Sequence, residues 1–477
     1  MRRSRRNIQS SIMWAGVESV VNILAALCVT LVVGRIIGPE AFGLASIAFL
    51  IGSFAEIFVG TPYYEPLIQR RRLERSLVDA AFTGMVATGA AVYLTILASA
   101  PLIARLYDEP GLTGLLAVQG LTCLLLGARG VPEAMMARKL RFGQIAVRTI
   151  IAKVASAVVS VAAALLGTGA WSIILGNVIF AFGTTAMVMA MTKRIPRLTT
   201  RLGEVASLWR FGMVSLLDAL LWGATPRLFN FFVSYFQGVR ALGELSIAFR
   251  INDAGWSLIV AIAGRLALPM LSRVADDRDR LERAFLQGTR IVYLVVSPIF
   301  LGIALTSREI IDLVLGPAWP LASPALVAVC LTSQCMVARM LAPPTIKAIA
   351  RPSLLILPSV IALLFITAGC IILRHAAFNT FLWVWISFGA ILVLCSLRAL
   401  QKAIGTGWLT QLKPLGPAVL PSLGMCGVVY AAALLDLGLS TWAMLLLKAA
   451  VGGLTYISLV FVLERALLTE LLKGRRA

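Results

Sequence analysis

Long apolar stretches, separated by short polar connections, fill almost all of this chain. About 20 consecutive apolar residues are enough to cross the hydrocarbon core of a bilayer as an α-helix, which satisfies its own backbone hydrogen bonds. The pattern therefore predicts an all-α integral membrane protein with about fourteen transmembrane helices. The expected segments are 11–34, 41–60, 80–104, 112–131, 145–167, 170–191, 209–236, 241–270, 284–306, 320–341, 352–373, 379–400, 414–435 and 440–463.

A short motif occurs twice, with an offset of 200 residues: Gly38-Pro-Glu-Ala-Phe-Gly43-Leu-Ala-Ser-Ile-Ala-Phe49 returns as Gly238-Val-Arg-Ala-Leu-Gly243-Glu-Leu-Ser-Ile-Ala-Phe249. Each copy lies between two apolar segments. Because glycine tolerates positive φ and close backbone approach, each copy predicts a tight turn between antiparallel helices. The offset covers six predicted helices, an even number, so the two halves are expected to be parallel repeats of the kind found in transporters.

The duplication also predicts the domain organisation. The first six helices would form an N-terminal lobe and the next six a C-terminal lobe, joined by a basic cytoplasmic linker. Helices 13 and 14 have no counterpart in this scheme and are expected to be an appended pair. The predicted boundaries are 1–191 for the N-terminal lobe, 192–208 for the linker, 209–400 for the C-terminal lobe, and 401–477 for the extra helices and tail.

Composition and charge narrow the class further. The chain is 59% hydrophobic and 14% charged, with a mean hydropathy of +0.91, which excludes a soluble globular protein. A net charge of +21 would suggest a nucleic-acid partner in a soluble protein, but here the basic residues lie in alternate connections, as in the run Arg70-Arg71-Arg72. This is the distribution of the positive-inside rule. It predicts cytoplasmic termini and membrane lipids, not nucleic acid, as the partner of the basic runs.

Residues that would carry enzymatic chemistry are sparse. The seven cysteines lie in apolar stretches without metal-ligand spacing, and the one histidine is His375. There is no Gly-x4-Gly-Lys-[Ser/Thr] phosphate loop and no long external loop. The sequence therefore predicts a protein that is not an enzyme and holds no metal or cofactor, although coupling to H⁺ or Na⁺ stays open.

Cations inside the predicted helices are the main candidates for a binding site. A charge at this depth is costly and marks a functional site by default, and arginine in particular forks onto phosphate oxygens. We expect a water-filled, net cationic cavity between the halves that holds an anionic ligand. The candidate substrate-binding residues are Arg148, Lys153, Arg227, Arg250, Arg265, Arg290 and Arg339.

Two other interpretations of these cations stay open. Arg148, Arg290 and Arg339 are near enough to the cytoplasmic ends of their helices to extend to the interface. Arg250 lies one helical turn before Asp253, so the two can form a structural pair.

Carboxylates inside the predicted helices are candidates for ion coupling. Glu18 and Asp218 are also 200 residues apart, so the duplication places one acid at the same depth in each half. Glu56 and Asp253 complete the set. Carboxylates at mid-depth titrate or bind cations, which would couple transport to H⁺ or Na⁺, but they would serve equally as fixed counter-ions of the arginines.

Several of these stretches resemble a known family. The stretches are Ile37-Gly-Pro-Glu-Ala-Phe-Gly-Leu44, Arg105-Leu-Tyr-Asp-Glu-Pro110, Leu242-Gly-Glu-Leu-Ser-Ile-Ala-Phe-Arg-Ile251 and Leu315-Gly-Pro-Ala-Trp319. In this order they resemble motifs of the polysaccharide transporters, the oligosaccharide (O-antigen) flippase branch of the multidrug, oligosaccharidyl-lipid and polysaccharide flippase superfamily. The likeness covers helices 1 to 10 well and the last four loosely.

The resemblance implies a function. It implies movement of an undecaprenyl-pyrophosphate-linked oligosaccharide from the inner to the outer leaflet of a bacterial plasma membrane, for lipopolysaccharide, capsule or exopolysaccharide synthesis. A polysaccharide polymerase and glycosyltransferases are the implied protein partners. Asn230 and Glu244 stand where family members often carry an acid or a tyrosine, so the resemblance does not assign the ion-coupling residue.

Two other functions are weighed against the flippase. A multidrug or cation exporter of the same superfamily would require an acidic or aromatic cavity, whereas the predicted cavity is basic. A non-transporting membrane scaffold that recruits glycosyltransferases would depend on its cytoplasmic loops and not on the cavity.

Overall fold

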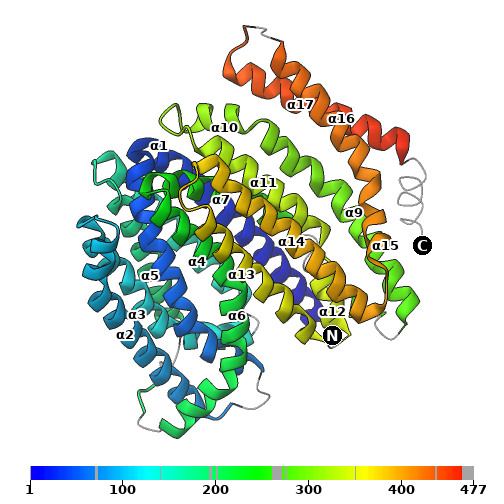
Figure 1. Ribbon diagram of the computed structural model, residues 1–477. Helices are drawn as coiled ribbons and strands as arrows, with labels where there is room; N and C mark the ends of the chain where they lie inside the picture. The colour runs from blue at the N-terminus through cyan, green and yellow to red at the C-terminus, as the bar shows by residue number, and fades with distance from the viewer. Residues whose placement is uncertain are drawn as a thin grey trace. The chain divides into compact units, whose positions relative to one another are not determined.

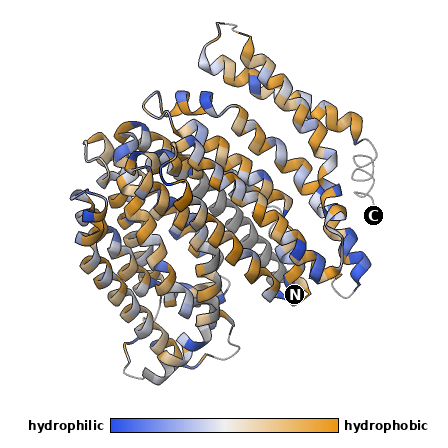
Figure 2. Ribbon diagram, viewed as in Figure 1, coloured by the Kyte–Doolittle hydropathy of each residue, from blue (hydrophilic) through white to orange (hydrophobic). Residues whose placement is uncertain are grey.

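The computed structural model describes residues 2–69, 73–139, 141–192, 196–199, 202–259, 271–272, 274, 277–349, 351–435 and 438–464. Within these ranges all regular structure is helical, and eleven helices are long and apolar enough to cross a membrane. Figure 2 shows that most helices are hydrophobic over much of their length. The predicted all-α membrane fold is therefore confirmed. The count of fourteen helices stays a prediction, because segment 241–270 extends beyond the described residues.

The helices fall into two compact units, Met1–Ser246 and Ile247–Ala477 (Figure 1). Unit 1 contains α1 (Arg2–Gln69), α2 (Arg75–Leu106), α3 (Gly111–Arg138), α4 (Phe142–Leu165), α5 (Trp171–Met191), α6 (Leu202–Phe236) and the start of α7 (Val239–Ile259). Unit 2 contains the rest of α7, then α9 (Arg278–Leu305), α10 (Ser307–Val314), α11 (Ala322–Ala338), α12 (Ala342–Ala348), η2 (Pro352–Leu355), α13 (Ile356–Ile372), α14 (Phe378–Ile404), α15 (Trp408–Leu412), η3 (Lys413–Leu415), α16 (Gly416–Leu434) and α17 (Thr441–Leu463). The lobes predicted from the repeat stay a prediction.

Helix α1 is the centre of unit 1. It contacts α2, α3, α4, α5 and α6, and it takes in two of the predicted segments. The two arms of α1 meet at Gly38, whose φ of 78° is left-handed, and a Cβ there would meet no atom within 4 Å. Backbone conformation, not lack of space, therefore requires glycine at this turn. The turn predicted between the first two segments is confirmed at Gly38.

The two copies of the repeated motif pack against each other. A Cβ on Gly43 would lie 2.1 Å from the carbonyl oxygen of Val239, and a Cβ on Gly243 would lie 2.0 Å from that of Pro39. Gly43 corresponds to Gly243, and Pro39 corresponds to Val239, each with the same offset of 200 residues. The contact is therefore symmetric with respect to the repeat. The motif is thus a close helix contact as well as a turn, of the kind that small residues allow in membranes.

In unit 2, α9 packs against α11 and α16, and α14 packs against α11 and α13. The side chains of Leu281, Phe285, Ile346 and Leu400 form part of a buried core between α9, α12 and α14. Helices α16 and α17, predicted as an appended pair, pack against each other and against α9.

Ion pairs and hydrogen bonds attach this pair to the rest of unit 2. Lys448 on α17 pairs with Glu309 on α10, and Glu464 at the end of α17 pairs with Arg290 on α9. Between these two pairs, the Tyr456 hydroxyl donates to the carbonyl oxygen of Leu294 at 2.8 Å. The appended helices are therefore fixed to the lobe at several levels along α17.

Candidate functional site

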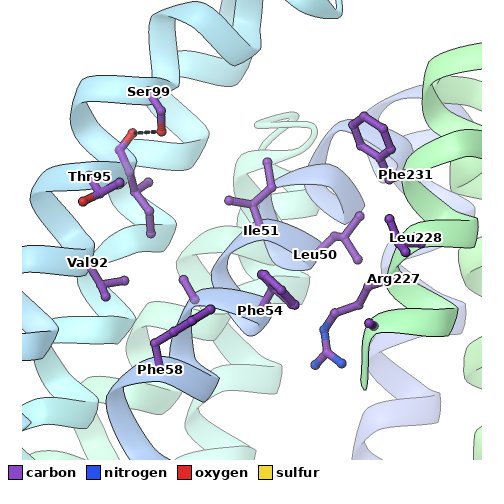
Figure 3. A pocket seen from close by; sticks show the side chains of 13 residues that line it. Leu50, Ile51, Phe54, Phe58, Val92, Thr95, Ser99, Arg227, Leu228 and Phe231 are labelled. Carbon is purple, nitrogen blue, oxygen red and sulfur yellow. Dashed lines mark hydrogen bonds between the residues drawn. The ribbon is translucent and has the colours of Figure 1, made fainter. Parts of the chain in front are cut away.

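An open chamber of about 540 Å³ lies within unit 1, between the second arm of α1, α2 and α6. Its lining positions recur at spacings of three and four residues on each helix, so each helix turns one face to the chamber. Figure 3 shows side chains from all three helices around it. We call it the Arg227 chamber. Its lining residues are Leu50, Ile51, Phe54, Ala55, Phe58, Val92, Thr95, Ile96, Ser99, Ala224, Arg227, Leu228 and Phe231.

The walls of the Arg227 chamber are almost entirely apolar. The two hydroxyl groups in its lining are already used within α2: Thr95 Oγ1 donates to the carbonyl oxygen of Ala91 at 2.9 Å, and Ser99 Oγ donates to that of Ile96 at 3.2 Å. The guanidinium of Arg227 is therefore the main polar group that the chamber presents (Figure 3).

Arg227 has no acidic partner among the described residues. Its Nη1 donates to the carbonyl oxygen of Gly223, one turn earlier on α6, at 2.9 Å. Its Nε is buried and finds no hydrogen-bond acceptor in the described structure. The neighbouring Pro226 lies inside α6, which continues from Leu202 to Phe236. A half-buried cation with unused donor capacity attracts an anion.

A hydrogen bond joins the end of α2 to α6 near Phe231. The Tyr107 hydroxyl lies 2.8 Å from Ser234 Oγ, which itself donates to the carbonyl oxygen of Phe231 at 2.8 Å. Tyr107 is therefore the donor to Ser234. Burial raises the pKa of the Tyr107 phenol, partly offset by this hydrogen bond, so the phenol keeps its proton at physiological pH.

A second, polar pocket of about 270 Å³ lies between α1, α2 and α3, with Tyr64, Arg129 and Glu133 in its lining. Glu133 forms an ion pair with Arg148 on α4, at 3.2 Å from Oε2 to Nη1, and the Arg148 side chain is 4% exposed. Arg129 Nη1 donates to Thr184 Oγ1 on α5 at 2.6 Å. An ion pair therefore joins α3 to α4, and a hydrogen bond from a charged donor to a hydroxyl joins α3 to α5.

Arg129 and Glu133 were not predicted as site residues. Residues 129 and 133 are one helical turn apart on α3, a spacing that puts both side chains on one face. This spacing of two charged residues on one helix face was the sequence feature from which the pocket could have been predicted. The half-buried Glu56 of α1, predicted for ion coupling, lies within electrostatic reach of Arg129 together with Glu133.

The predicted substrate-binding cations have different partners. Arg148 and Arg290 are each paired with a carboxylate, Glu133 and Glu464 respectively. Lys153 Nζ lies 5.1 Å from the centre of the Phe180 ring, and Arg339 Nε donates to Ser396 Oγ at 2.8 Å.

Helix α7 carries the predicted pair Arg250 and Asp253. The Asp253 residue is exposed, and the two charges attract each other across one turn. Beside them, Ser333 Oγ on α11 donates to Asn252 Oδ1 at 2.8 Å and accepts from Trp256 Nε1 at 2.9 Å. This buried polar network fixes α7 to α11 within unit 2.

Three predicted residues cannot be placed. Arg265 lies outside the described residues, and the side chains of Glu18 on α1 and Asp218 on α6 are likewise outside the described part of the structure. Their assignments as a substrate ligand and as ion-coupling residues stay predictions.

Comparison with known proteins gives relatives along most of the chain. A family model described as polysaccharide biosynthesis protein matches residues 32–324. The succinoglycan biosynthesis transport protein ExoT of Rhizobium meliloti is 23% identical over 62% of this chain and 60% of its own length. The lipopolysaccharide biosynthesis protein WzxC of Escherichia coli is 23% identical over 68% of this chain and 67% of its own length. The matches thus span 60% and 67% of the length of these two relatives.

Among solved structures, the lipid II flippase MurJ in an inward closed conformation matches with a TM-score of 0.78. The match covers 96% of this chain and 100% of that one at 15% identity. At this identity the match shows a shared fold.

Proposed function

Since this chain belongs to the polysaccharide biosynthesis protein family, we propose that it is a flippase for a lipid-linked oligosaccharide. The cargo is a glycan carried on undecaprenyl pyrophosphate. The protein moves it from the inner to the outer leaflet of a bacterial plasma membrane, for the synthesis of lipopolysaccharide, capsule or exopolysaccharide. The family resemblance read from the sequence motifs is confirmed by the match over residues 32–324.

One observation supports the proposal most directly: the guanidinium of Arg227. It lines an apolar chamber, has no acidic partner among the described residues, and leaves its buried Nε without an acceptor. A cationic donor set of this kind suits phosphate oxygens. An amphiphile in which a phosphate is attached to a hydrocarbon chain fits both the positive charge of Arg227 and the apolar lining of the chamber.

The cargo divides between two environments during transport. Its sugars and pyrophosphate must avoid hydrocarbon, because unsatisfied polar groups there cost several kcal/mol each. Its lipid chain stays in the bilayer or on apolar protein surface. The transporter exposes the headgroup to one side and then the other, and no covalent bond of the cargo is made or broken. The protein is accordingly proposed to be a transporter and not an enzyme.

The proposed orientation places both termini in the cytoplasm. The basic connections, including the run before α2, face anionic lipid headgroups on that side. Coupling to H⁺ or Na⁺ through Glu18, Glu56, Asp218 or Asp253 is part of the proposal, as are a polymerase and glycosyltransferases as partners on the pathway.

The experiment compares variants of Arg227 in a strain that lacks the chromosomal copy. Arg227→Gln removes the charge and is expected to lower surface polysaccharide by about tenfold or more and to raise the pool of undecaprenyl-linked oligosaccharide facing the cytoplasm. Arg227→Lys keeps the charge and is expected to retain part of the activity. Arg105→Gln, at the exposed end of α2, is the matched control. Normal surface polysaccharide in Arg227→Gln at equal protein level would contradict the proposal.

The same strain separates the rival functions. A multidrug or cation exporter predicts increased drug susceptibility with normal polysaccharide when the protein is absent. A scaffold for glycosyltransferases predicts that Arg227→Gln is harmless while changes in the cytoplasmic connections abolish synthesis.

A further inference from the structure

We propose that the Arg227 chamber is the binding site for the polyprenyl chain of the carrier lipid. It holds the part of the chain that is attached to the phosphate. This inference rests on the proposed flippase function. It adds where the lipid part of the cargo binds and which residues contact its phosphate and its hydrocarbon chain. Arg227 contacts the phosphate, and the apolar walls of α1, α2 and α6 hold the first isoprene units.

The lining excludes the glycan as the occupant. A sugar needs several hydrogen-bonding partners when it leaves water, because each unsatisfied hydroxyl is costly. Thr95 and Ser99 already donate to the backbone of α2, and the remaining wall, apart from Arg227, is hydrocarbon and aromatic. Hydrocarbon is the chemistry that this wall accepts, and a volume of about 540 Å³ is in the range of ligand pockets.

The cation excludes a purely neutral occupant. A neutral hydrocarbon in the chamber would cover Arg227 and leave its buried Nε without an acceptor. An amphiphile with an anionic end at Arg227 supplies that acceptor and fills the apolar wall with the same molecule. The chamber therefore fits a phosphate bonded directly to a hydrocarbon chain.

The arrangement favours a polyprenyl phosphate over a diacyl phospholipid. A polyprenyl phosphate has one chain attached directly to its phosphate. A phospholipid has two chains separated from the phosphate by glycerol and two polar ester groups. The wall beside Arg227 offers aromatic faces, Phe54 on α1 and Phe231 on α6, and no free donor for ester carbonyls (Figure 3).

The experiment measures binding of farnesyl phosphate to the purified full chain by native mass spectrometry from detergent micelles. Farnesol and inorganic phosphate serve as the two half-ligands, and phosphatidylglycerol serves as the competing membrane lipid. We expect farnesyl phosphate to bind about tenfold or more tightly than either half-ligand and phosphatidylglycerol to compete poorly.

Two tryptophan variants on α2 form a matched pair. Val92→Trp fills the chamber, whereas Leu94→Trp places the same side chain two residues away at a position that is 62% exposed and outside the lining. Val92→Trp is expected to weaken farnesyl phosphate binding about tenfold and Leu94→Trp by less than about twofold. Arg227→Gln is expected to abolish the preference for farnesyl phosphate over farnesol. If Val92→Trp does not fold, Ala55→Leu fills the chamber from α1.

Equal binding of farnesyl phosphate by Val92→Trp and Leu94→Trp would overturn the inference. Phosphatidylglycerol that competes as well as farnesyl phosphate itself would also overturn it, because the chamber would then be a general lipid site. Transport of lipid-linked oligosaccharide in the same variants distinguishes this failure from that of the proposed function. Normal transport by Val92→Trp counts against the chamber alone. Absence of transport by the wild-type protein in reconstituted vesicles counts against the flippase function, whether or not farnesyl phosphate binds to the protein.

Discussion

At the scale of single residues, arginines that look alike in the sequence have different surroundings. Arg148 and Arg290 each reach a carboxylate, whereas Arg227 and Arg339 reach neutral oxygen atoms. A buried pair is neutral as a unit, and its loss leaves a charge stranded in a medium of low polarity. No carboxylate of the described residues forms an ion pair with Arg227 or Arg339, so neither charge is neutralised within the described part of the structure.

The pair Arg148–Glu133 gives a prediction at this scale. Arg148→Gln leaves Glu133 without its ion-pair partner, and Glu133→Gln strands Arg148, whose side chain is 4% exposed. Each single change is expected to lower the free energy of unfolding by about 3 kcal/mol. The double variant is expected to lose less than the sum of the two. Thermal unfolding of the purified protein in detergent measures the cycle. Additive losses would show that the two side chains act independently.

At the scale of elements, the duplicated motif has two physical roles. Gly38 supplies the left-handed backbone at which the arms of α1 meet, and Gly43 and Gly243 bring the two copies into contact. Close contact at small residues replaces the hydrophobic effect, which does not drive helices together in lipid. The contact is symmetric about the repeat, so its geometry depends on both copies.

Alanine at Gly43 tests that contact. The new Cβ would lie 2.1 Å from the carbonyl oxygen of Val239, which belongs to the backbone and cannot rotate away. We expect Gly43→Ala to destabilise the protein by about 1–3 kcal/mol and Gly243→Ala to do the same. Gly453→Ala, on α17 with no atom within 4 Å of the new Cβ, is the control and is expected to be neutral or stabilising. Thermal unfolding compares them, and a Gly43→Ala curve that matches the Gly453→Ala curve would contradict the close contact.

At the scale of the whole molecule, the alternation of basic and non-basic connections orients the chain. Helix α2 has 32 residues, enough to cross a bilayer, so the connections at its two ends face opposite sides. The basic run Arg70-Arg71-Arg72 precedes α2, and the acidic residues Asp108 and Glu109 follow the end of α2. The proposed orientation therefore places Glu74 inside and Asp108 outside.

Cysteine labelling checks this orientation. In a background without the seven native cysteines, Asp108→Cys is expected to react with a membrane-impermeant maleimide in cells whose outer surface is accessible. Glu74→Cys is expected to react only after the plasma membrane is opened. Both residues are exposed, so access depends on the side of the membrane and not on burial. The opposite pattern would invert the proposed topology.

Much of the fold follows from short-range pattern. Apolar stretches of spanning length predict helices because lipid cannot satisfy a free backbone group. The turn between the first two predicted segments was predictable in the same way, because glycine tolerates positive φ, and the two arms of α1 do meet at the non-helical Gly38. Of the candidate site, Arg227 was found as a cation at membrane depth, but the apolar character of its chamber was not.

The sequence by itself determined that the chain is an all-helical membrane protein, that it contains a duplication, and that it resembles polysaccharide transporters. These properties are carried by local composition, by spacing and by motifs. Only the tertiary structure decided which charges neutralise each other, as Arg148 does with Glu133 from another helix, and which stay available, as Arg227 does. Ion pairing depends on distances across packed helices, and the rotation of each helix about its axis sets those distances, which no local pattern records.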